Sequence, residues 1–270
     1  MNHAHDISGS DAIAHAFVLA RSSSLAVTDY PGEEPATLAD AYAIQDRAIA
    51  AWPDQFAGWK LGRINAPHDA DFGAGRLAGP IFSRNVWRAG AAPTRFDVID
   101  GGFAAVEAEY VLVLGETPPD RDDWTAETVA PLVARAMTGV EIAGSPFAGI
   151  NALGPAVTAS DFGNNAGLIL GQDIPDWSDR LADLRCETRI DGVVIGTGGA
   201  ASIPNGPLDS LAFLLNLLHR RGRRLEAGHL ISTGAATGVH VVGIGQSATA
   251  DFGPDGQIDC VAVAAGGVPA

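Results

Sequence analysis

An apolar run that carries two glutamates constrains the fold of this chain most. Residues 103–114 read Phe-Ala-Ala-Val-Glu-Ala-Glu-Tyr-Val-Leu-Val-Leu and lie between Gly101-Gly102 and Gly115. Their β-branched and aromatic content and the bracketing glycines predict a buried strand. Because side chains alternate faces along a strand, Glu107 and Glu109 point the same way. The alternative is an edge strand with both glutamates in water, which the uncharged flanks disfavour.

A third carboxylate, Glu141, lies in a second apolar segment, residues 138–143. A buried glutamate needs a partner, and no basic residue lies near it in sequence. The partner is either an Arg or Lys from another segment, or a metal ion shared with Glu107 and Glu109. Buried carboxylates repel each other and lose their hydration, and a divalent cation removes that cost. Their oxygens are the ligands of Mg²⁺ or Mn²⁺, so we predict a metal site at Glu107, Glu109 and Glu141.

Composition limits the partners of the chain. Among 270 residues, 32 are acidic and 17 basic, a formal net charge of −15. Nucleic-acid phosphates require a basic surface, so we expect no nucleic-acid partner. We expect no membrane association and a cytoplasmic location, because no apolar run approaches ~18 residues and residues 1–6 do not resemble a signal peptide. Cys186 and Cys260 form neither a disulfide framework nor a zinc motif.

Periodicity divides the chain into an N-terminal helical segment, residues 1–55, and a strand-rich catalytic domain, residues 56–270. We expect one helix over 11–21 and another from Thr37, which opens a capping-box-like sequence, to Trp52 before Pro53. Short apolar runs separated by glycine predict strands in the remainder. Further helices are expected over 125–137 and 207–220. The fold class is α+β.

Lys60 is a second chemical candidate, in Gly58-Trp-Lys-Leu-Gly62. The flanking glycines let the backbone pass close to another group, and Trp59 can shield the ammonium from water. A buried lysine can stabilise an enolate or exchange protons. The alternative is an ordinary lysine at the end of a strand, with its ammonium in solvent.

Two polar loops complete the candidates. Asp161, Asn164 and Asn165 can position a polar ligand, or can simply form Asx turns. Ser232 and Thr233 begin a glycine-containing loop whose hydroxyl and N–H groups can bind a carboxylate; it lacks the Gly-Lys-Ser/Thr element of a phosphate loop. His68 and His240 have no ligand spacing, and we expect them to be hydrogen-bonded or solvent-facing.

In this order and spacing, the motifs resemble the fumarylacetoacetate hydrolase superfamily, and within it the 2-keto-4-pentenoate hydratase and 4-oxalocrotonate decarboxylase branch. The resemblance covers residues 37–263. It rests on Ala41-Tyr-Ala-Ile-Gln45, Gly58-Trp-Lys-Leu-Gly62, Asp71-Phe-Gly73, Val106-Glu-Ala-Glu-Tyr-Val111, Val140-Glu-Ile142, Gly206-Pro-Leu-Asp-Ser-Leu-Ala-Phe-Leu214 and Leu225-Glu-Ala-Gly-His-Leu-Ile-Ser-Thr-Gly234. A glutamate as the third ligand resembles the hydratases more than the hydrolases.

The resemblance implies a mixed β-sheet roll that follows the N-terminal helical segment. It also implies a homo-oligomeric lyase that uses Mg²⁺ or Mn²⁺ and acts on unsaturated 2-oxo acids in aromatic catabolism. The enzyme would add water, or remove CO₂ from an oxalocrotonate-type diacid, through a dienolate stabilised by the metal and Lys60. On this basis Lys60 and Asp161 are expected to act in catalysis. The residues expected to bind substrate are Arg63, Asp71, Asn164, Asn165, Ser232 and Thr233.

The chain departs from this branch in two places. The segment between Lys60 and Asp71 is shorter than usual, which predicts a reduced or reshaped lid. The acidic residue that usually follows the Asp-Phe-Gly turn is absent from residues 74–80, where Arg76 lies, so hydration and decarboxylation both stay open. Arg63 would bind a second carboxylate and favour a diacid. The alternatives are an acylpyruvate-type carbon–carbon hydrolase on the same metal site and an inactive relative that acts as a binding or assembly partner.

Overall fold

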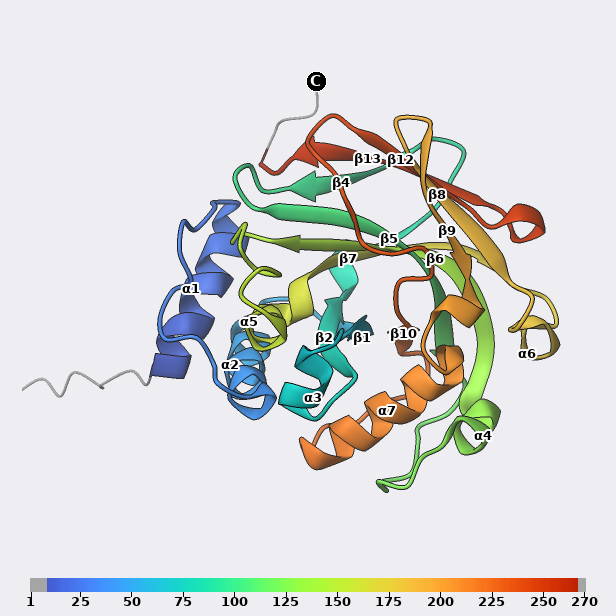
Figure 1. Cartoon of the computed structure of the whole chain (residues 1–270), viewed down its shortest axis with the longest axis horizontal. Coiled ribbons are helices and arrows are strands. Elements are labelled where there is room, and N and C mark those ends of the chain that lie inside the picture. The colour runs from blue at the N-terminus through green and yellow to red at the C-terminus, as the bar shows by residue number, and fades with distance from the viewer. Residues whose placement is uncertain (1–8, 267–270) are drawn as a thin grey trace, which may run out of the picture.

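The computed structural model describes residues 9–266, which form two mixed β-sheets with helices on the outside (Figure 1). The larger sheet has the strand order β2-β1-β10-β5-β6-β7-β3, and β11 pairs with β5 as its eighth strand. The β1–β10 and β3–β7 pairs are parallel and the others antiparallel. Its strands are β1 (Phe56–Arg63), β2 (Arg76–Phe82), β3 (Val86–Arg88), β5 (Phe103–Leu114), β6 (Val133–Ser145), β7 (Asn165–Asp173), β10 (Leu230–Ser232) and β11 (His240–Val241).

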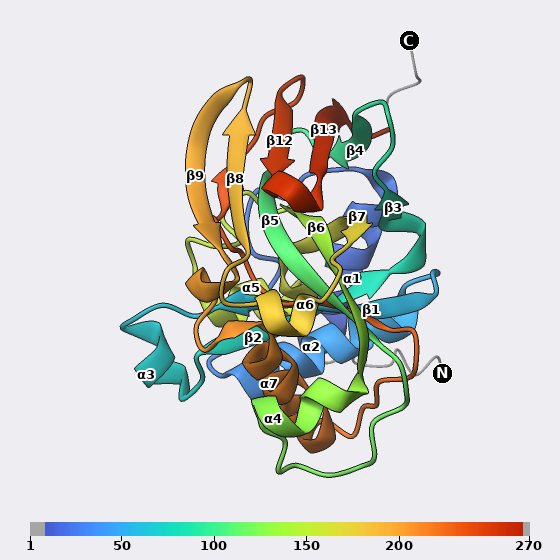
Figure 2. The same ribbon diagram turned by 90° about the vertical axis from the view of Figure 1, so that its right-hand side faces the viewer.

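The smaller sheet has five strands in the order β4-β13-β12-β8-β9 and lies over the long strands β5 and β6, as Figures 1 and 2 show. The alternation of β5 explains this layering. Its even-numbered residues, such as Tyr110, belong to the main apolar core together with Phe96 and Phe252. The odd-numbered Glu107 and Glu109 therefore face the other side, towards the inside of the larger sheet. The strands are β4 (Thr94–Val98), β8 (Arg185–Ile190), β9 (Val193–Gly199), β12 (Ser247–Asp251) and β13 (Gln257–Ala264).

Three predicted helices are confirmed, over 11–21, 37–52 and 207–220. In the second, the Thr37 side chain caps the helix by accepting a hydrogen bond from the Asp40 N–H, and the helix ends just before Trp52 and Pro53. The helices are α1 (Gly9–Ser23), α2 (Leu38–Ala51), α3 (His68–Phe72), α4 (Ala126–Val129), α5 (Pro155–Ser160), α6 (Trp177–Arg180) and α7 (Gly206–Arg220). In Figure 1, α1 and α2 flank one side of the roll and α7 lies beneath it.

The helix predicted over 125–137 is wrong beyond its first turns. α4 is followed by a 3₁₀ turn, Ala130–Leu132, and then by β6, which begins at Val133. Val133 and Met137 pair with Leu114 and Val111 at the far end of β5. The helical propensity of Ala-Arg-Ala-Met is weaker than the pairing with a strand that is already buried.

The larger sheet curls back on itself, because β2 contacts both β7 and the 3₁₀ turn η3 (Phe162–Asn164). A Cβ atom at Gly79 on β2 would lie 1.9 Å from the carbonyl oxygen of Phe162, so only glycine allows this approach. The predicted α+β fold with a mixed β-roll is confirmed. The proposed boundary at residue 55 stays a prediction, and residues 1–8 and 267–270 of its two parts lie outside the described range. No helix within residues 9–266 has the length and apolarity to cross a membrane.

Candidate metal centre

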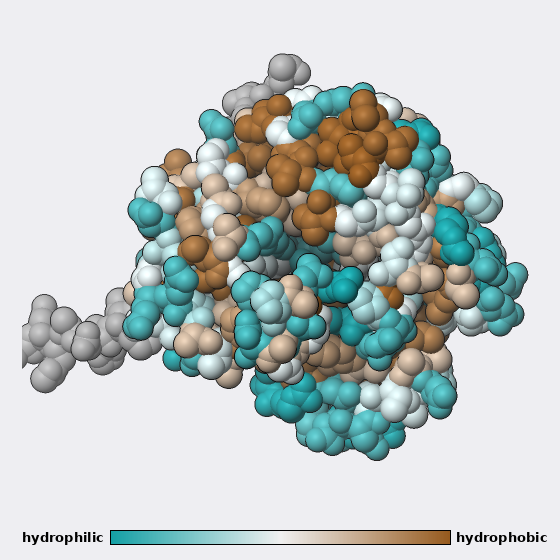
Figure 3. All heavy atoms as spheres, viewed as in Figure 1, coloured by the Kyte–Doolittle hydropathy of each residue, from teal (hydrophilic) through white to brown (hydrophobic). Residues whose placement is uncertain are grey.

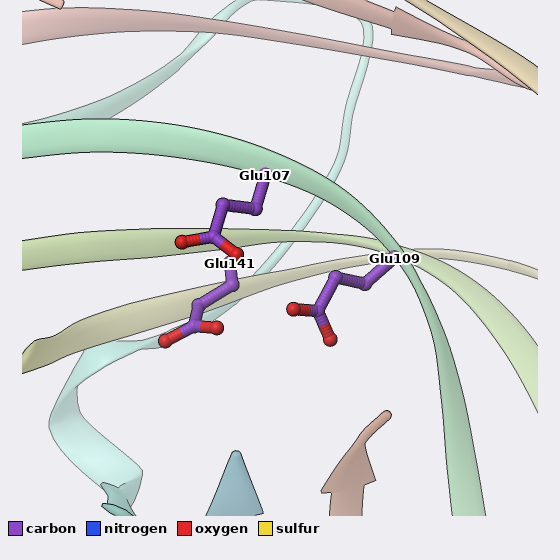
Figure 4. Close-up of side chains that lie close together, drawn as sticks. All are labelled: Glu107, Glu109 and Glu141. Atoms are coloured by element: carbon purple, nitrogen blue, oxygen red, sulfur yellow. The ribbon is translucent and has the colours of Figure 1, made fainter. Parts of the chain in front are cut away.

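Three glutamates converge on one point inside the roll, as Figure 4 shows. Glu107 and Glu109 extend from β5, and Glu141 extends from β6, directly opposite Glu107 in the antiparallel pairing. One oxygen from each carboxylate lies within 4.8 Å of the other two, and all three residues are buried. Like charges placed opposite each other on a sheet are destabilising unless a cation joins them.

Lys60 on β1 reaches the same point. Its Nζ lies 3.2 Å from Glu141 Oε1 and donates a hydrogen bond to Asn164 Oδ1 at 3.0 Å. Asn165 Nδ2 donates to the same Glu141 oxygen, also at 3.0 Å. Burial acts to lower the pKa of Lys60, but the nearby glutamates outweigh it and the pKa is raised above its ordinary value. The neighbouring glutamates therefore favour the charged ammonium form of Lys60.

A hydroxyl group at the end of β10 and a backbone N–H just after it orient Glu109. Ser232 Oγ donates to Glu109 Oε2 at 2.5 Å, and the Gly234 N–H donates to the same oxygen at 2.9 Å. Burial and the two neighbouring glutamates still raise the pKa of Glu109 well above its usual range. Burial, with the charge of Glu141, likewise raises the pKa of Glu107 to about 8. These carboxylates are thus costly to ionise without a further cation.

The residues present fit a hard divalent cation. Among the described residues, no donor reaches Glu109 Oε1 or Glu141 Oε2, although both oxygens are buried. When all three carboxylates are ionised, Lys60 balances only one of their charges, and a divalent ion would balance the other two. The donor set is entirely oxygen, which suits Mg²⁺ or Mn²⁺ rather than zinc.

A cavity of about 690 Å³ opens beside this cluster, and Glu107, Lys60 and Asn164 are among its lining residues. Figure 3, drawn in the same view as Figure 1, shows a hollow near the centre of this face of the molecule. Arg63 and Arg76 also line the cavity and bring positive charge to it. Further polar groups in the lining are Asn151, Thr158, Thr197, Ser202 and Thr237.

Asp161, which was predicted to act in catalysis, is not among the residues that line the cavity, and its role stays a prediction. Its carboxylate accepts hydrogen bonds from Arg21 Nε at 2.6 Å, from Arg21 Nη2 at 2.9 Å and from Ser145 Oγ at 2.6 Å. The side chain is buried and does not appear among the lining residues. A carboxylate so fully paired has no free oxygen to offer a substrate, so its position argues for a structural role.

The expected substrate-binding residues fall into three groups. Arg63, Asn164 and Thr233 line the cavity, but the Thr233 hydroxyl donates to the Tyr110 carbonyl oxygen at 2.6 Å. Asn165 and Ser232 are not among the lining residues, and instead donate hydrogen bonds to Glu141 and Glu109, respectively. Asp71 is exposed on α3, does not line the cavity, and lies 3.6 Å from Nδ1 of His68, which does. The roles of all these residues stay predictions.

Sequence reasoning missed two contributors. Asn151 accepts a hydrogen bond from Asn164 Nδ2 at 3.0 Å and lines the cavity, but no local pattern marks it. Arg21 binds the segment that carries Asn164 and Asn165, from a helix more than a hundred residues away in sequence. Arg76, noted only as a departure from the family, is buried against Asp209, with 2.9 Å between Nη1 and Oδ2.

Solved structures share this architecture. The fold is similar to that of 4-oxalocrotonate decarboxylase from Pseudomonas putida G7, complexed with magnesium and adipate, with a TM-score of 0.80 and 22% identity over 97% of this chain and 100% of that one. A structure from Yersinia pestis CO92 that is ascribed to the fumarylacetoacetate hydrolase family matches with a TM-score of 0.54 and 14% identity over 78% of this chain and 95% of that one. The chain has the fold of the fumarylacetoacetate hydrolase superfamily. Fumarylpyruvate hydrolase from Pseudomonas aeruginosa, in complex with Mn²⁺ and pyruvate, matches the same superfamily fold with a TM-score of 0.58 and 15% identity over 78% of this chain and 91% of that one.

Sequence similarity agrees over a shorter stretch. The chain is 38% identical over 106 residues to 2-oxo-hept-4-ene-1,7-dioate hydratase from Escherichia coli, which spans 38% of this chain and 39% of that relative. No family model matches the chain. The predicted resemblance to the hydratase and decarboxylase branch of the superfamily is confirmed.

Proposed function

We propose that the protein is a Mg²⁺- or Mn²⁺-dependent lyase that adds water to, or removes CO₂ from, unsaturated 2-oxo acids. The observation that carries this proposal is the convergence of Glu107, Glu109, Glu141 and the Lys60 ammonium beside one cavity. The relatives support it: one is named as a hydratase of an unsaturated 2-oxo diacid and another as 4-oxalocrotonate decarboxylase, in a structure with magnesium. An inactive binding or assembly partner would not need to keep this costly cluster.

The metal, when bound, would supply Lewis acidity towards the carboxylate and 2-oxo oxygens of the substrate. Lys60 would stabilise the negative charge that develops on the substrate, and would give or take a proton at Nζ. Asn164 holds that ammonium in place, and Asn165 orients Glu141 by its hydrogen bond. Burial of the whole group keeps bulk water away from the reacting atoms, which strengthens each of these interactions.

A diacid is the substrate class that the cavity favours. Arg63 lines the cavity, and no ion pair among residues 9–266 uses its guanidinium, so it is available to a second carboxylate. Arg76 adds positive charge to the lining, although Asp209 already pairs with it. The carboxylate next to the 2-oxo group of the substrate would then lie towards the glutamates and the metal. The distal carboxylate would lie towards Arg63.

The proposal is tested by incubating purified protein and Mg²⁺ with a panel of 2-hydroxydienoates, in matched monoacid and diacid forms, and with acylpyruvates. Products are identified by mass spectrometry and NMR. Gain of water identifies a hydratase and loss of CO₂ a decarboxylase. Cleavage of an acylpyruvate into two acids would instead identify a carbon–carbon hydrolase. Metal binding without turnover of any compound would favour an inactive relative.

Self-association is part of the same proposal, with a second copy of this chain as the partner. β9 is an edge strand of the smaller sheet, and its Val193, Val194 and Ile195 are 64%, 47% and 40% exposed. Exposed apolar edge strands readily pair with another chain. Light scattering after size exclusion should give a mass above that of one chain, and Val194→Lys should shift it towards the monomer.

A cytoplasmic location is also proposed, since Cys186 and Cys260 are buried free thiols, which suit a reducing compartment.

A further inference from the structure

A buried arginine on the first helix reaches the turn that supports the metal centre. Arg21 lies in the last turn of α1, and its side chain is only 9% exposed. It forms a bidentate pair with Asp161 and also donates to three backbone carbonyl oxygens, that of Asn165 at 3.0 Å, that of Gly144 at 2.9 Å and that of Asp161 at 3.4 Å. One side chain therefore ties α1 to β6 and to both ends of the segment 161–165.

That segment has an unfavourable backbone. Phe162, Gly163 and Asn164 are consecutive left-handed residues, with φ of 54°, 59° and 56°. Side-chain-bearing residues rarely adopt this conformation, and it persists only where surrounding contacts fix it. The Arg21 guanidinium supplies one such contact, since it lies 5.1 Å from the ring centroid of Phe162. The N-terminal helices supply another, because Phe162 packs in their apolar cluster.

The left-handed turn decides where the two asparagines point. Asn164 accepts from the Lys60 ammonium, and Asn165 donates to Glu141, so each contacts a charged group of the metal centre. If the turn relaxed towards an ordinary conformation, both side chains would leave these partners. Glu141 would then lose a donor that fixes its carboxylate, and Lys60 would lose its neutral acceptor.

We propose that Arg21 is a positioning residue of the metal centre, acting through Asp161 to hold segment 161–165 in its left-handed conformation. The inference rests on the proposed metal-dependent function of that centre. Groups that orient metal ligands commonly affect metal affinity or activity by about 10- to 100-fold. Arg21 acts one contact further away, so the lower end of that range is expected.

The test compares Arg21→Met with Arg47→Met as a matched control. Arg47 also joins α1 to the rest of the protein, with 2.6 Å between its Nε and Asp11 Oδ1, but this pair is about half exposed and does not touch segment 161–165. Three properties are measured: amide hydrogen exchange in peptides that cover 161–165, Mn²⁺ affinity by calorimetry, and kcat and KM on the best substrate. Arg21→Met should speed exchange there, weaken Mn²⁺ binding about 10-fold and lower kcat more than it changes KM. Arg47→Met should leave all three as in the wild type.

Two further variants guard against a protein that fails to fold. Arg21→Met leaves the Asp161 carboxylate buried without its cation, so Arg21→Met combined with Asp161→Asn removes that charge as well. Arg21→Lys keeps the charge but cannot span the same acceptors, and should restore exchange and Mn²⁺ affinity only in part. The proposal is overturned if the folded double variant matches Arg47→Met in exchange and in Mn²⁺ affinity.

The outcome is separable from that of the proposed function. If wild-type protein bound no Mn²⁺ and converted no 2-oxo acid, the proposed function would fail. The exchange comparison would still decide the role of Arg21. Faster amide exchange over 161–165 in the Arg21 variants, but not in Arg47→Met, would support its role in holding the segment. The same exchange rates in the Arg21 variants and in Arg47→Met would overturn that role.

Discussion

Two buried charge clusters contact segment 161–165, and they differ in how completely their charges are matched. In the first cluster, Arg21 and Asp161 form a bidentate pair, and Ser145 and backbone carbonyls use their remaining donors and acceptors. In the second cluster, the three glutamates have a single ammonium between them, and two of their buried oxygens have no donor in the described part of the chain.

From this difference we infer that the paired cluster is structural and that the glutamate cluster is the functional site. A fully paired buried ion pair is consistent with a structural role and leaves nothing for a ligand. An incompletely paired cluster is unfavourable for the fold by itself, and it is retained where a bound cation or a reaction needs it. The glutamate cluster is of the second kind, and the following predictions test that distinction.

The largest effect is expected from Glu109→Ala. Glu109 offers one oxygen that is held by Ser232 and Gly234 and another that has no donor within residues 9–266, so it is the carboxylate best prepared for a cation. Calorimetry with Mg²⁺ or Mn²⁺ should show about one site per chain in the wild type. The variant should lose at least ~100-fold in affinity, more than the loss of an outer hydrogen-bond partner produces.

Thermal unfolding supplies the control for this variant. Mg²⁺ at about 100 times its Kd should raise the free energy of unfolding of the wild type by about 2.7 kcal/mol, and the same concentration should raise that of Glu109→Ala by no more than about 0.4 kcal/mol. Asp173→Ala, which removes an exposed carboxylate, should bind metal as the wild type does. Equal metal binding by the triple alanine variant of Glu107, Glu109 and Glu141 would refute the assignment of the site.

Lys60→Met should have the next largest effect. Methionine keeps most of the volume of the lysine stem but removes the charge beside Glu141. We expect kcat to fall by roughly 100-fold, as when one charge contact to the transition state or one acid–base group is lost. KM should change less than kcat, because the ammonium is needed most as negative charge develops on the substrate. Circular dichroism and Mn²⁺ titration should show an intact fold and metal site; unchanged turnover would make Lys60 a structural residue.

Arg63→Ala should have a smaller and more selective effect. An exposed ion pair contributes up to about 1 kcal/mol, so KM for a diacid should rise by about 5-fold. KM for the matched monoacid should stay the same, since it lacks the second carboxylate. Arg84→Ala is the control, because Arg84 is also exposed but does not line the cavity. Equal changes in KM for diacid and monoacid would rule out Arg63 as the receptor of the distal carboxylate.

How well the sequence predicts each region depends on how local its causes are. The bounds of β5 and the shared direction of Glu107 and Glu109 follow from alternation within one strand, and both appear in the structure. The start of α2 follows from Thr37 in the same way. Residues 133–137 could not be predicted, because their extended form depends on pairing with β5 and their composition favours a helix.

The pairing of Arg21 with Asp161 could not be predicted from the sequence for a different reason. Arg21 and Asp161 are 140 residues apart, and no periodicity connects them. Asp161 and Asn164 are three residues apart and were expected to act together, yet the left-handed turn between them directs Asp161 to Arg21 and Asn164 to Lys60. The left-handed conformation of Phe162 cannot be anticipated from its residue type, whereas asparagine, as at position 164, adopts this conformation more often.

The smallest effect is expected at an ion pair that belongs to neither cluster. Arg135 Nη1 lies 3.3 Å from Asp173 Oδ1, and the two side chains are 43% and 56% exposed. Solvent screens this pair, so Arg135→Met should lower the free energy of unfolding by no more than about 0.5 kcal/mol in urea titrations, and should leave metal affinity unchanged. Arg21→Met breaks a similar ion pair in a buried position and leaves the Asp161 carboxylate without its cation, so its larger cost would be due to burial. A loss at Arg135 as large as that at Arg21 would mean that exposure does not separate scaffold from surface in this protein, and the contrast between the two buried clusters would lose its physical basis.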